Sequence, residues 1–120
     1  MDKMKLLYVE DIEEIRTAVR LQMEYFFSND DYELILAENG SIGLEKYHND
    51  SPDLIITDID MPVINGIEMI KIIRLENVFI PIIITSAFDP KQYYEFMQNY
   101  NISEYFTKPF CVKTLTDRIN

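Results

Sequence analysis

The sequence is poor in several residue types, and each shortage excludes a class of protein. Cys111 is the only cysteine among 120 residues, so no internal disulfide can form, and a reducing, cytoplasmic location is expected. We expect Cys111 to be a buried hydrophobic side chain. His48 is the only histidine, which argues against a zinc site. The chain also has neither an apolar stretch of roughly 20 residues nor a signal-peptide pattern, so no membrane span is expected.

Basic residues are also scarce. The chain has 11 Lys and Arg against 21 Asp and Glu, a formal net charge of -10. Such an acidic surface argues against direct binding to nucleic acid or to an anionic membrane. The content of hydrophobic residues, 48%, and of charged residues, 27%, is ordinary for a globular protein. We therefore expect residues 1–120 to form one domain with a real core.

Strand-like and helix-like segments alternate along the whole chain. Short apolar runs predict five strands, near 4–9, 32–37, 53–58, 81–86 and 102–107. Helical spacing and turn signals predict five helices, near 12–27, 41–49, 65–76, 90–100 and 110–119. Five such units with right-handed crossovers give an α/β fold with a doubly wound, five-stranded parallel sheet.

Two of the predicted helices carry an apolar stripe. In the first helix the stripe consists of Ile12, Ile15, Val19, Met23 and Phe26. In the fourth helix it consists of Tyr93, Phe96, Met97 and Tyr100. We expect both stripes to face the core, and we expect Tyr94, which lies off the second stripe, to be exposed. Asn39-Gly40 and Asn65-Gly66 are turn signals just before helices.

Polar residues stand where the apolar strands end. Glu10 and Asp11 follow the first strand, Asp58 ends the third, Ser86 ends the fourth, and Lys108 follows the fifth. Neighbouring parallel strands bring their carboxyl ends to one edge of the sheet, which is where open α/β sheets bind ligands. Carboxylates, a hydroxyl and an ammonium would then converge. That set can hold a divalent cation and a phosphoryl group.

Each of these residues also has a plainer explanation. Asp58 can be a turn residue or a helix N-cap, Asp11 can cap the first helix, and Lys108 can be a surface lysine. The carboxylates taken together change the balance, because neighbouring carboxylates repel unless a cation intervenes. Mg²⁺ (or Mn²⁺) suits such a cluster of oxygen ligands. A cis Lys108-Pro109 bond is one way to direct the lysine back over the sheet edge.

Asp58 is the candidate nucleophile of this site, and its product would be an aspartyl phosphate. Lys108, Ser86, a backbone N–H and the metal ion would surround the phosphoryl group, as phosphoryl transfer requires.

These residues and their order make the chain similar to a two-component response-regulator receiver domain, of the kind found in chemotaxis regulators. The likeness covers nearly the whole chain, and its motifs are Glu10-Asp11, Asp58, Met61-Pro62, Gly66, Ser86-Ala87 and Lys108-Pro109-Phe110. It implies a flavodoxin-like sheet of order 2-1-3-4-5. It also implies phosphorelay signal transduction, in which Asp58 accepts a phosphoryl group from a sensor histidine kinase or a phosphotransfer protein.

The resemblance implies further roles within the site. Asp11 and Asp58 would bind Mg²⁺ directly, Glu10 mainly through water, and Asp60 through its backbone carbonyl. The domain would then catalyse only its own phosphorylation and dephosphorylation.

The resemblance also implies a switch. Ser86 would move toward the phosphoryl group and Tyr105 would turn inward, which would change the surface formed by the fourth helix, fifth strand and fifth helix. The output partner is not identified by the sequence. A phosphorylation-dependent homodimer through this surface, using Tyr94, is one outcome that its aromatic residues allow.

Three residues depart from the common pattern of the family: Glu10 stands where many relatives have aspartate, and the other two are Asn101 and Phe88. Asn101 stands where glycine is frequent before the fifth strand, and asparagine tolerates the left-handed conformation that this turn needs. Asp60 and Phe88 are expected to border the approach of the hydrolytic water. Because Phe88 offers that water no hydrogen bond, we expect slow loss of the phosphoryl group.

Three alternatives remain at this point. Asp58-Ile59-Asp60 fits the D-x-D of haloacid-dehalogenase-type phosphatases, but that motif normally ends a first strand, and 120 residues leave no room for a substrate cap. A degenerate receiver that acts only as a binding module is the second alternative. A flavin carrier is the third, although no phosphate loop rich in Ser, Thr and Gly follows the first strand.

Overall fold

A computed structural model describes residues 3–27, 30–61, 64–110 and 112–119. The predicted burial of Cys111 and the position of Pro62 in the Met61-Pro62 motif fall outside these residues.

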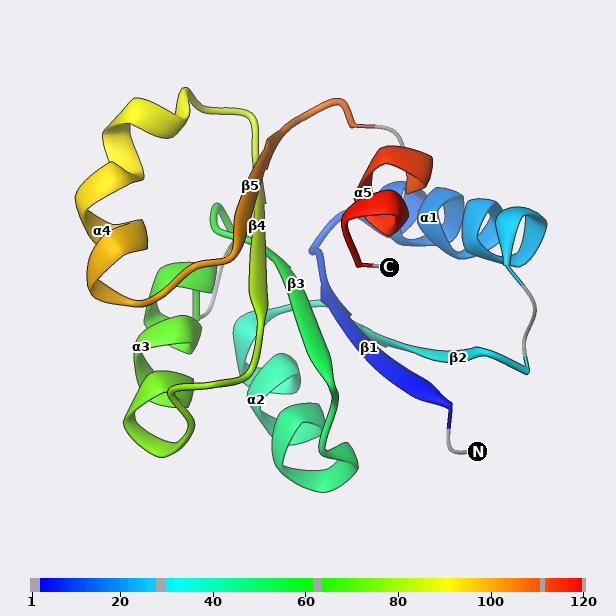
Figure 1. The fold of residues 1–120 in the computed structure, drawn as a ribbon, viewed down its shortest axis with the longest axis horizontal. Helices are drawn as coiled ribbons and strands as arrows, with labels where there is room; N and C mark the ends of the chain where they lie inside the picture. The colour runs from blue at the N-terminus through cyan, green and yellow to red at the C-terminus, as the bar shows by residue number, and fades with distance from the viewer. Residues whose placement is uncertain (1–2, 28–29, 62–63, 111, 120) are drawn as a thin grey trace.

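The described residues form a parallel sheet covered by helices on both faces (Figure 1). The strands are β1 (Met4–Val9), β2 (Tyr32–Ala37), β3 (Leu54–Asp58), β4 (Ile82–Ser86) and β5 (Glu104–Thr107). The helices are α1 (Glu13–Phe26), α2 (Gly40–Asp50), α3 (Gly66–Glu76), α4 (Tyr94–Asn99) and α5 (Val112–Ile119). The strand order is β2-β1-β3-β4-β5, which confirms the predicted flavodoxin-like arrangement.

Each face of the sheet has its own core. Alternate strand residues point to opposite faces, so Leu6 and Ile56 pack under α1 and α5, while Leu7 and Ile55 pack under α2, α3 and α4 (Figure 1). The central strands are buried along their length, as the unbroken apolar runs predicted. No described helix is long and apolar enough to cross a membrane.

The ends of α1 differ from the predicted stripe. Val19 and Met23 are buried, but Ile12 is 44% exposed and Phe26 is 45% exposed. Ile12 has extended backbone and precedes the first helical turn, so helical spacing does not apply to it. Phe26 is the last residue of the helix, where fewer neighbours cover a side chain.

The predicted fourth helix is two pieces. A 3₁₀ turn, η1 (Pro90–Tyr93), precedes the short α4, and the carboxylate of Asp89 accepts a hydrogen bond from the Lys91 N–H at 2.9 Å. The aromatic stripe of this segment packs against the core as predicted, and Tyr94 is 54% exposed. Asn101 has φ 53°, which is the left-handed conformation expected there.

Two Asn-Gly pairs begin helices at the edge of the sheet where β3 ends. The Asn39 side chain accepts a hydrogen bond from the Ile42 N–H, and the Asn65 side chain accepts one from the Glu68 N–H. A Cβ atom at Gly66 would lie 2.1 Å from the carbonyl oxygen of Asp58. Only glycine therefore lets α3 start this close to the end of β3.

Candidate functional site

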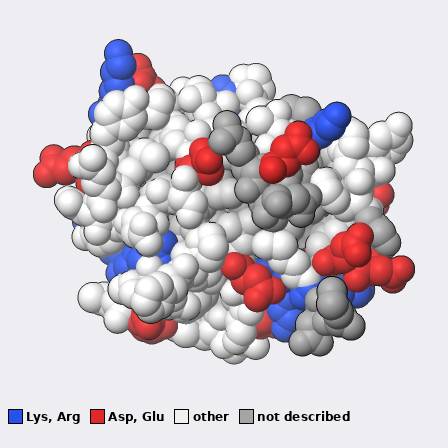
Figure 2. Space-filling model, in the orientation of Figure 1, with Lys and Arg blue, Asp and Glu red and all other residues white. Residues whose placement is uncertain are grey.

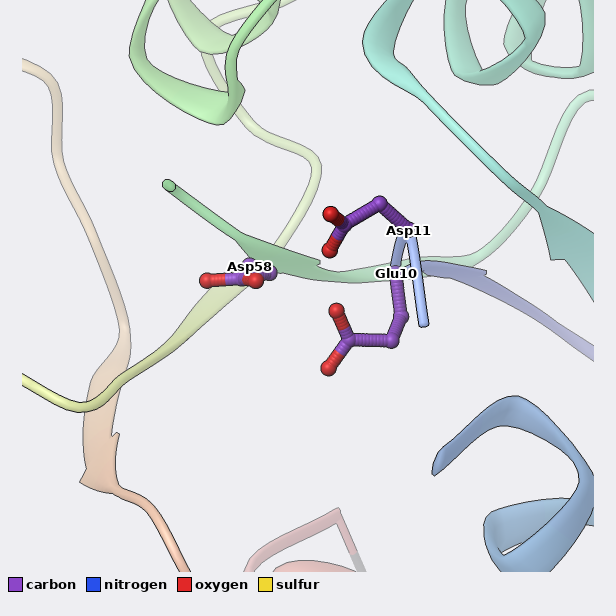
Figure 3. Close-up of side chains that lie close together, drawn as sticks. All are labelled: Glu10, Asp11 and Asp58. Carbon is purple, nitrogen blue, oxygen red and sulfur yellow. The ribbon is translucent and has the colours of Figure 1, made fainter. Parts of the chain in front are cut away.

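Three carboxylates meet at the carboxyl edge of the sheet. Glu10 and Asp11 follow β1 and Asp58 ends β3, and their side chains point toward one another in Figure 3. One oxygen from each lies within 4.8 Å of the others. The cause is the register of the sheet, because Val9 pairs with Thr57 and the next residues of the two strands are Glu10 and Asp58. Glu10 is fully buried and Asp58 is 4% exposed.

Lys108 joins two of these carboxylates. Its ammonium donates hydrogen bonds to Glu10 Oε1 at 2.5 Å and to Asp58 Oδ2 at 3.0 Å. Its backbone N–H donates to the Ser86 carbonyl at 2.7 Å, which extends the pairing of β5 with β4. The Lys108-Pro109 peptide bond is cis, the form that the sequence allowed. Through its two hydrogen bonds, the Lys108 ammonium belongs to the same site as the carboxylates.

The charges in this site perturb one another. Burial raises the pKa of the Glu10 carboxyl to about 7, although the hydrogen bond from Lys108 lowers it. Burial by itself lowers the pKa of the Lys108 ammonium, but hydrogen bonds to Glu10 and Asp58 outweigh burial and raise that pKa above its usual value. One ammonium does not compensate three neighbouring carboxylates, so a second cation would stabilise the site.

The donor set fits a hard divalent cation. All three side chains offer carboxylate oxygens, and Glu10 Oε2 is buried with no hydrogen-bond partner among the described residues. Mg²⁺ and Mn²⁺ prefer oxygen ligands of this kind. Asp11 does not cap α1, because the N-cap residue is Ile12 and its side chain makes no capping bond. The Asp11 carboxylate is thus left for the acidic cluster.

Backbone groups hold the nucleophile candidate in place. Asp58 Oδ1 accepts a hydrogen bond from the Asp60 N–H at 3.2 Å, so the two oxygens of Asp58 have different partners. Arg16 Nη1 donates to the Glu10 carbonyl at 2.7 Å, which ties α1 to the end of β1. Sequence reasoning missed Arg16, because its neighbours in the helix give no sign of this contact. The Asp60 side chain itself is exposed.

The predicted switch residues lie beside the cluster. Ser86 is buried, and its Oγ accepts a hydrogen bond from the Phe88 N–H at 3.1 Å. The Tyr105 hydroxyl donates to the Phe88 carbonyl at 2.9 Å, and its ring stacks on Tyr93. The backbone of Phe88 therefore contacts both residues of the predicted switch pair, Ser86 and Tyr105. The Phe88 side chain is 41% exposed.

Two buried polar residues near the site were not predicted. Tyr8 lies in the apolar run that predicts β1, and Thr85 lies in the run that predicts β4. Each carries a buried oxygen without a partner among the described residues. The period-2 alternation of strands was the available signal, since it places Tyr8 on the same face as Glu10.

A five-stranded parallel sheet of this order, with three carboxylates and a lysine at its carboxyl edge, is the arrangement expected of a response-regulator receiver domain. Comparison with known proteins agrees. The family model "Response regulator receiver domain" matches residues 6–120, so the chain belongs to this family and acts in phosphorelay signal transduction. Asp58, the first residue of the motif Asp58-Ile59-Asp60, ends the third strand of the fold. In haloacid-dehalogenase-type phosphatases that motif normally ends the first strand.

Several relatives are similar over nearly the whole chain. The alkaline phosphatase synthesis transcriptional regulatory protein PhoP of Bacillus subtilis is 30% identical over 115 residues, which cover 96% of this chain and 46% of that protein. The response regulator ArlR of Staphylococcus saprophyticus is 33% identical over 115 residues, covering 96% of this chain and 50% of that protein. The chain thus spans about half the length of these relatives.

Solved structures show the same fold. The chemotaxis response regulator CheY4 of Vibrio cholerae is 27% identical with a TM-score of 0.84, and the match covers 98% of this chain and 97% of that one.

Proposed function

We propose that the domain accepts a phosphoryl group on Asp58 in a step that requires Mg²⁺ or Mn²⁺. The donor is the phosphohistidine of a sensor histidine kinase or of a phosphotransfer protein. The observation that carries this proposal is the Lys108 ammonium, which bridges Glu10 and Asp58 inside a cluster of three carboxylates. A packing role alone does not explain why buried strands end on so many charges.

Each residue has a defined task in this reaction. A carboxylate oxygen of Asp58 attacks phosphorus and forms the new P–O bond. The P–N bond of the donor breaks, and its electron pair stays on the imidazole nitrogen, which then takes up a proton. Lys108 already contacts Asp58 and compensates the negative charge that arrives with the phosphoryl group. The domain in this proposal catalyses only its own phosphorylation and dephosphorylation.

The carboxylates would hold the divalent cation. Asp11 and Asp58 would bind it directly, Glu10 through water, and Asp60 through its backbone carbonyl. When bound, the ion neutralises charge on the phosphoryl oxygens and orients them.

Ser86 and Tyr105 would transmit the signal. The Ser86 hydroxyl bonds within its own turn, to the Phe88 N–H, and the Tyr105 hydroxyl bonds to the Phe88 carbonyl. If Ser86 turns toward the new phosphoryl group, segment 86–88 moves, and the Tyr105 contact is released. The surface formed by α4, β5 and α5 then changes for an output partner, or for a second copy of the chain that contacts the exposed Tyr94.

Incubation with phosphoramidate or acetyl phosphate, followed by intact mass measurement, tests the proposal. We expect one phosphoryl group in the presence of Mg²⁺, and none in EDTA or in Asp58→Asn. Asp53→Asn is the matched control, because Asp53 lies at the opposite edge of the sheet and bonds to the Lys5 N–H. Full reaction of Asp58→Asn would overturn the assignment. No reaction of the wild-type domain would favour a receiver that only binds partners.

A further inference from the structure

The site contains more buried polar atoms than its hydrogen bonds use. Among the described residues, the Tyr8 hydroxyl, Glu10 Oε2 and Thr85 Oγ1 are buried and have no hydrogen-bond partner. Tyr8 is fully buried near the carboxyl end of β1. A buried hydroxyl without a partner destabilises a protein, and phenylalanine would fill the same space without that cost. Packing therefore explains the ring of Tyr8 but not its hydroxyl.

Strand geometry places these atoms on one face of the sheet. Tyr8 stands two residues before Glu10, so both side chains leave β1 toward α1 and α5. Asp58 pairs with Thr85 in the register of β3 and β4. Glu10, Asp58 and Thr85 thus form a row across three strands, and Tyr8 lies one row below Glu10. Two residues of a strand rise by roughly 6.6 Å, which a tyrosine side chain can span.

The electrostatic environment of Tyr8 agrees with this placement. Burial raises the pKa of the Tyr8 hydroxyl, and the charges of Glu10 and Asp58 raise it further. The Tyr8 hydroxyl is a hydrogen-bond donor on the face of the sheet that carries the two carboxylates.

We propose that Tyr8 is a positioning residue for the acidic site. Its hydroxyl donates, through one buried water that also meets Thr85 Oγ1, to Glu10 Oε2. A buried water of this kind needs two to four polar partners, and the three unpartnered atoms on this face of the sheet would supply them. This bond holds the Glu10 carboxylate with Oε1 on Lys108 and Oε2 at a set angle, so the site is arranged before a cation arrives.

The proposal rests on the proposed function, because it concerns the same cation site. The test compares Tyr8→Phe with Tyr32→Phe, which removes a hydroxyl from another buried tyrosine on the same face but at the amino end of the sheet. The first measurement is the Mg²⁺ dissociation constant of the unphosphorylated domain by calorimetry. We expect it to rise about tenfold in Tyr8→Phe and to stay unchanged in Tyr32→Phe.

A second measurement separates positioning from folding. In the wild-type domain, the ¹³C resonance of the Tyr8 Cζ atom should shift during Mg²⁺ titration, while that of Tyr32 should not. The Glu10 carboxyl resonance should differ between wild type and Tyr8→Phe before Mg²⁺ is added. Equal Mg²⁺ affinity in wild type and Tyr8→Phe would overturn the proposal, and so would a Tyr8 resonance that ignores Mg²⁺. Failure of the wild type to bind Mg²⁺ would instead contradict the proposed function.

Discussion

Arg74 and Lys108 are both cations withdrawn from solvent, but their partners differ in kind. The Arg74 guanidinium, at the C-terminal end of α3, donates to three backbone carbonyls, those of Asn77 at 3.0 Å, Tyr100 at 2.8 Å and Asn101 at 3.0 Å. The Lys108 ammonium donates to two carboxylates. The Arg74 guanidinium binds neutral carbonyl groups, which carry no negative charge for a further cation to compensate. The Lys108 ammonium lies among negative charges that it does not fully compensate.

The two environments move the pKa in opposite directions. Burial lowers the pKa of the Arg74 guanidinium. Burial also acts to lower the pKa of Lys108, but hydrogen bonds to Glu10 and Asp58 reverse the effect. Burial alone therefore does not mark a reactive site. An excess of one charge, together with unpartnered atoms such as Glu10 Oε2, does mark one.

The largest loss of stability is expected when the Arg74 guanidinium is removed. Arg74→Leu leaves three part-buried carbonyls without their donor and should lower the free energy of unfolding by about 3 kcal/mol. Phosphoryl uptake by the folded variant should stay within about twofold of wild type. Urea denaturation and intact mass measure the two quantities. Lys71→Leu, on an exposed position of the same helix, is the control. Equal stability of both variants would remove the structural role of Arg74.

A smaller loss of stability is expected when the Lys108 ammonium is removed. Lys108→Ala leaves Glu10 and Asp58 facing each other without the ammonium that lowers the pKa of Glu10, so protonation of Glu10 can relieve the repulsion. We therefore expect a loss of about 2 kcal/mol in the absence of Mg²⁺. Lys5→Ala, which removes an ammonium bound to the Asp50 carbonyl, should cost less than half as much.

Lys108→Ala also tests the role of Lys108 in signalling, apart from its role in stability. Beryllofluoride, which mimics the phosphoryl group, should shift fewer NMR resonances along residues 90–119 in Lys108→Ala than in wild type. The reason is that the ammonium that would contact this group is missing. Identical shifts in the two proteins would count against the role of Lys108 in the switch.

Phe88 tests whether shape as well as charge controls the site. Its ring is partly exposed, and its backbone contacts both Ser86 and Tyr105. We propose that the ring and the Asp60 carboxylate border the path of the hydrolytic water. Phe88→Ala should then speed loss of the phosphoryl group by roughly tenfold, or about 1.4 kcal/mol of barrier. The decay is followed by mass, with Phe79→Ala on a remote exposed phenylalanine as control. An unchanged rate would show that the ring is not a shield.

The smallest expected effect is the stabilisation by Mg²⁺ itself. At five times its dissociation constant, Mg²⁺ should raise the free energy of unfolding of the wild-type domain by about 1 kcal/mol. Asp58→Asn should lose most of that gain, because one of the proposed ligands is gone. Arg74→Leu should retain it. A gain in Asp58→Asn as large as in wild type would place the cation elsewhere.

Much of this architecture could be predicted from sequence because its causes are local. Apolar runs predicted β1 and β2 to the residue, and polar residues at the ends of β1, β3 and β5 predicted the meeting of Glu10, Asp58 and Lys108. Other features depend on contacts that no local pattern records. Arg74 binds carbonyls 26 and 27 residues away, at Tyr100 and Asn101.

Element ends and buried hydroxyls were the other limits. Helical spacing placed Ile12 on the core stripe, but the helix begins only after it. Tyr8 looked like one more apolar strand residue, since a sequence does not show whether a buried hydroxyl finds a partner. The carboxylate cluster was predictable from residue type and strand order, whereas the polar atoms beneath it required the register of three strands.

Asp58 forms the aspartyl phosphate in the proposed reaction, and the position of the modified residue can be measured directly. Reduction of the phosphorylated domain with borohydride converts an acyl phosphate of aspartate to homoserine, and peptide sequencing by mass spectrometry then locates that residue. We expect homoserine at position 58 in the domain treated with phosphoramidate and Mg²⁺, and at no position in a sample treated with phosphoramidate and EDTA. Homoserine at position 11 or 60 with an unmodified Asp58 would contradict it.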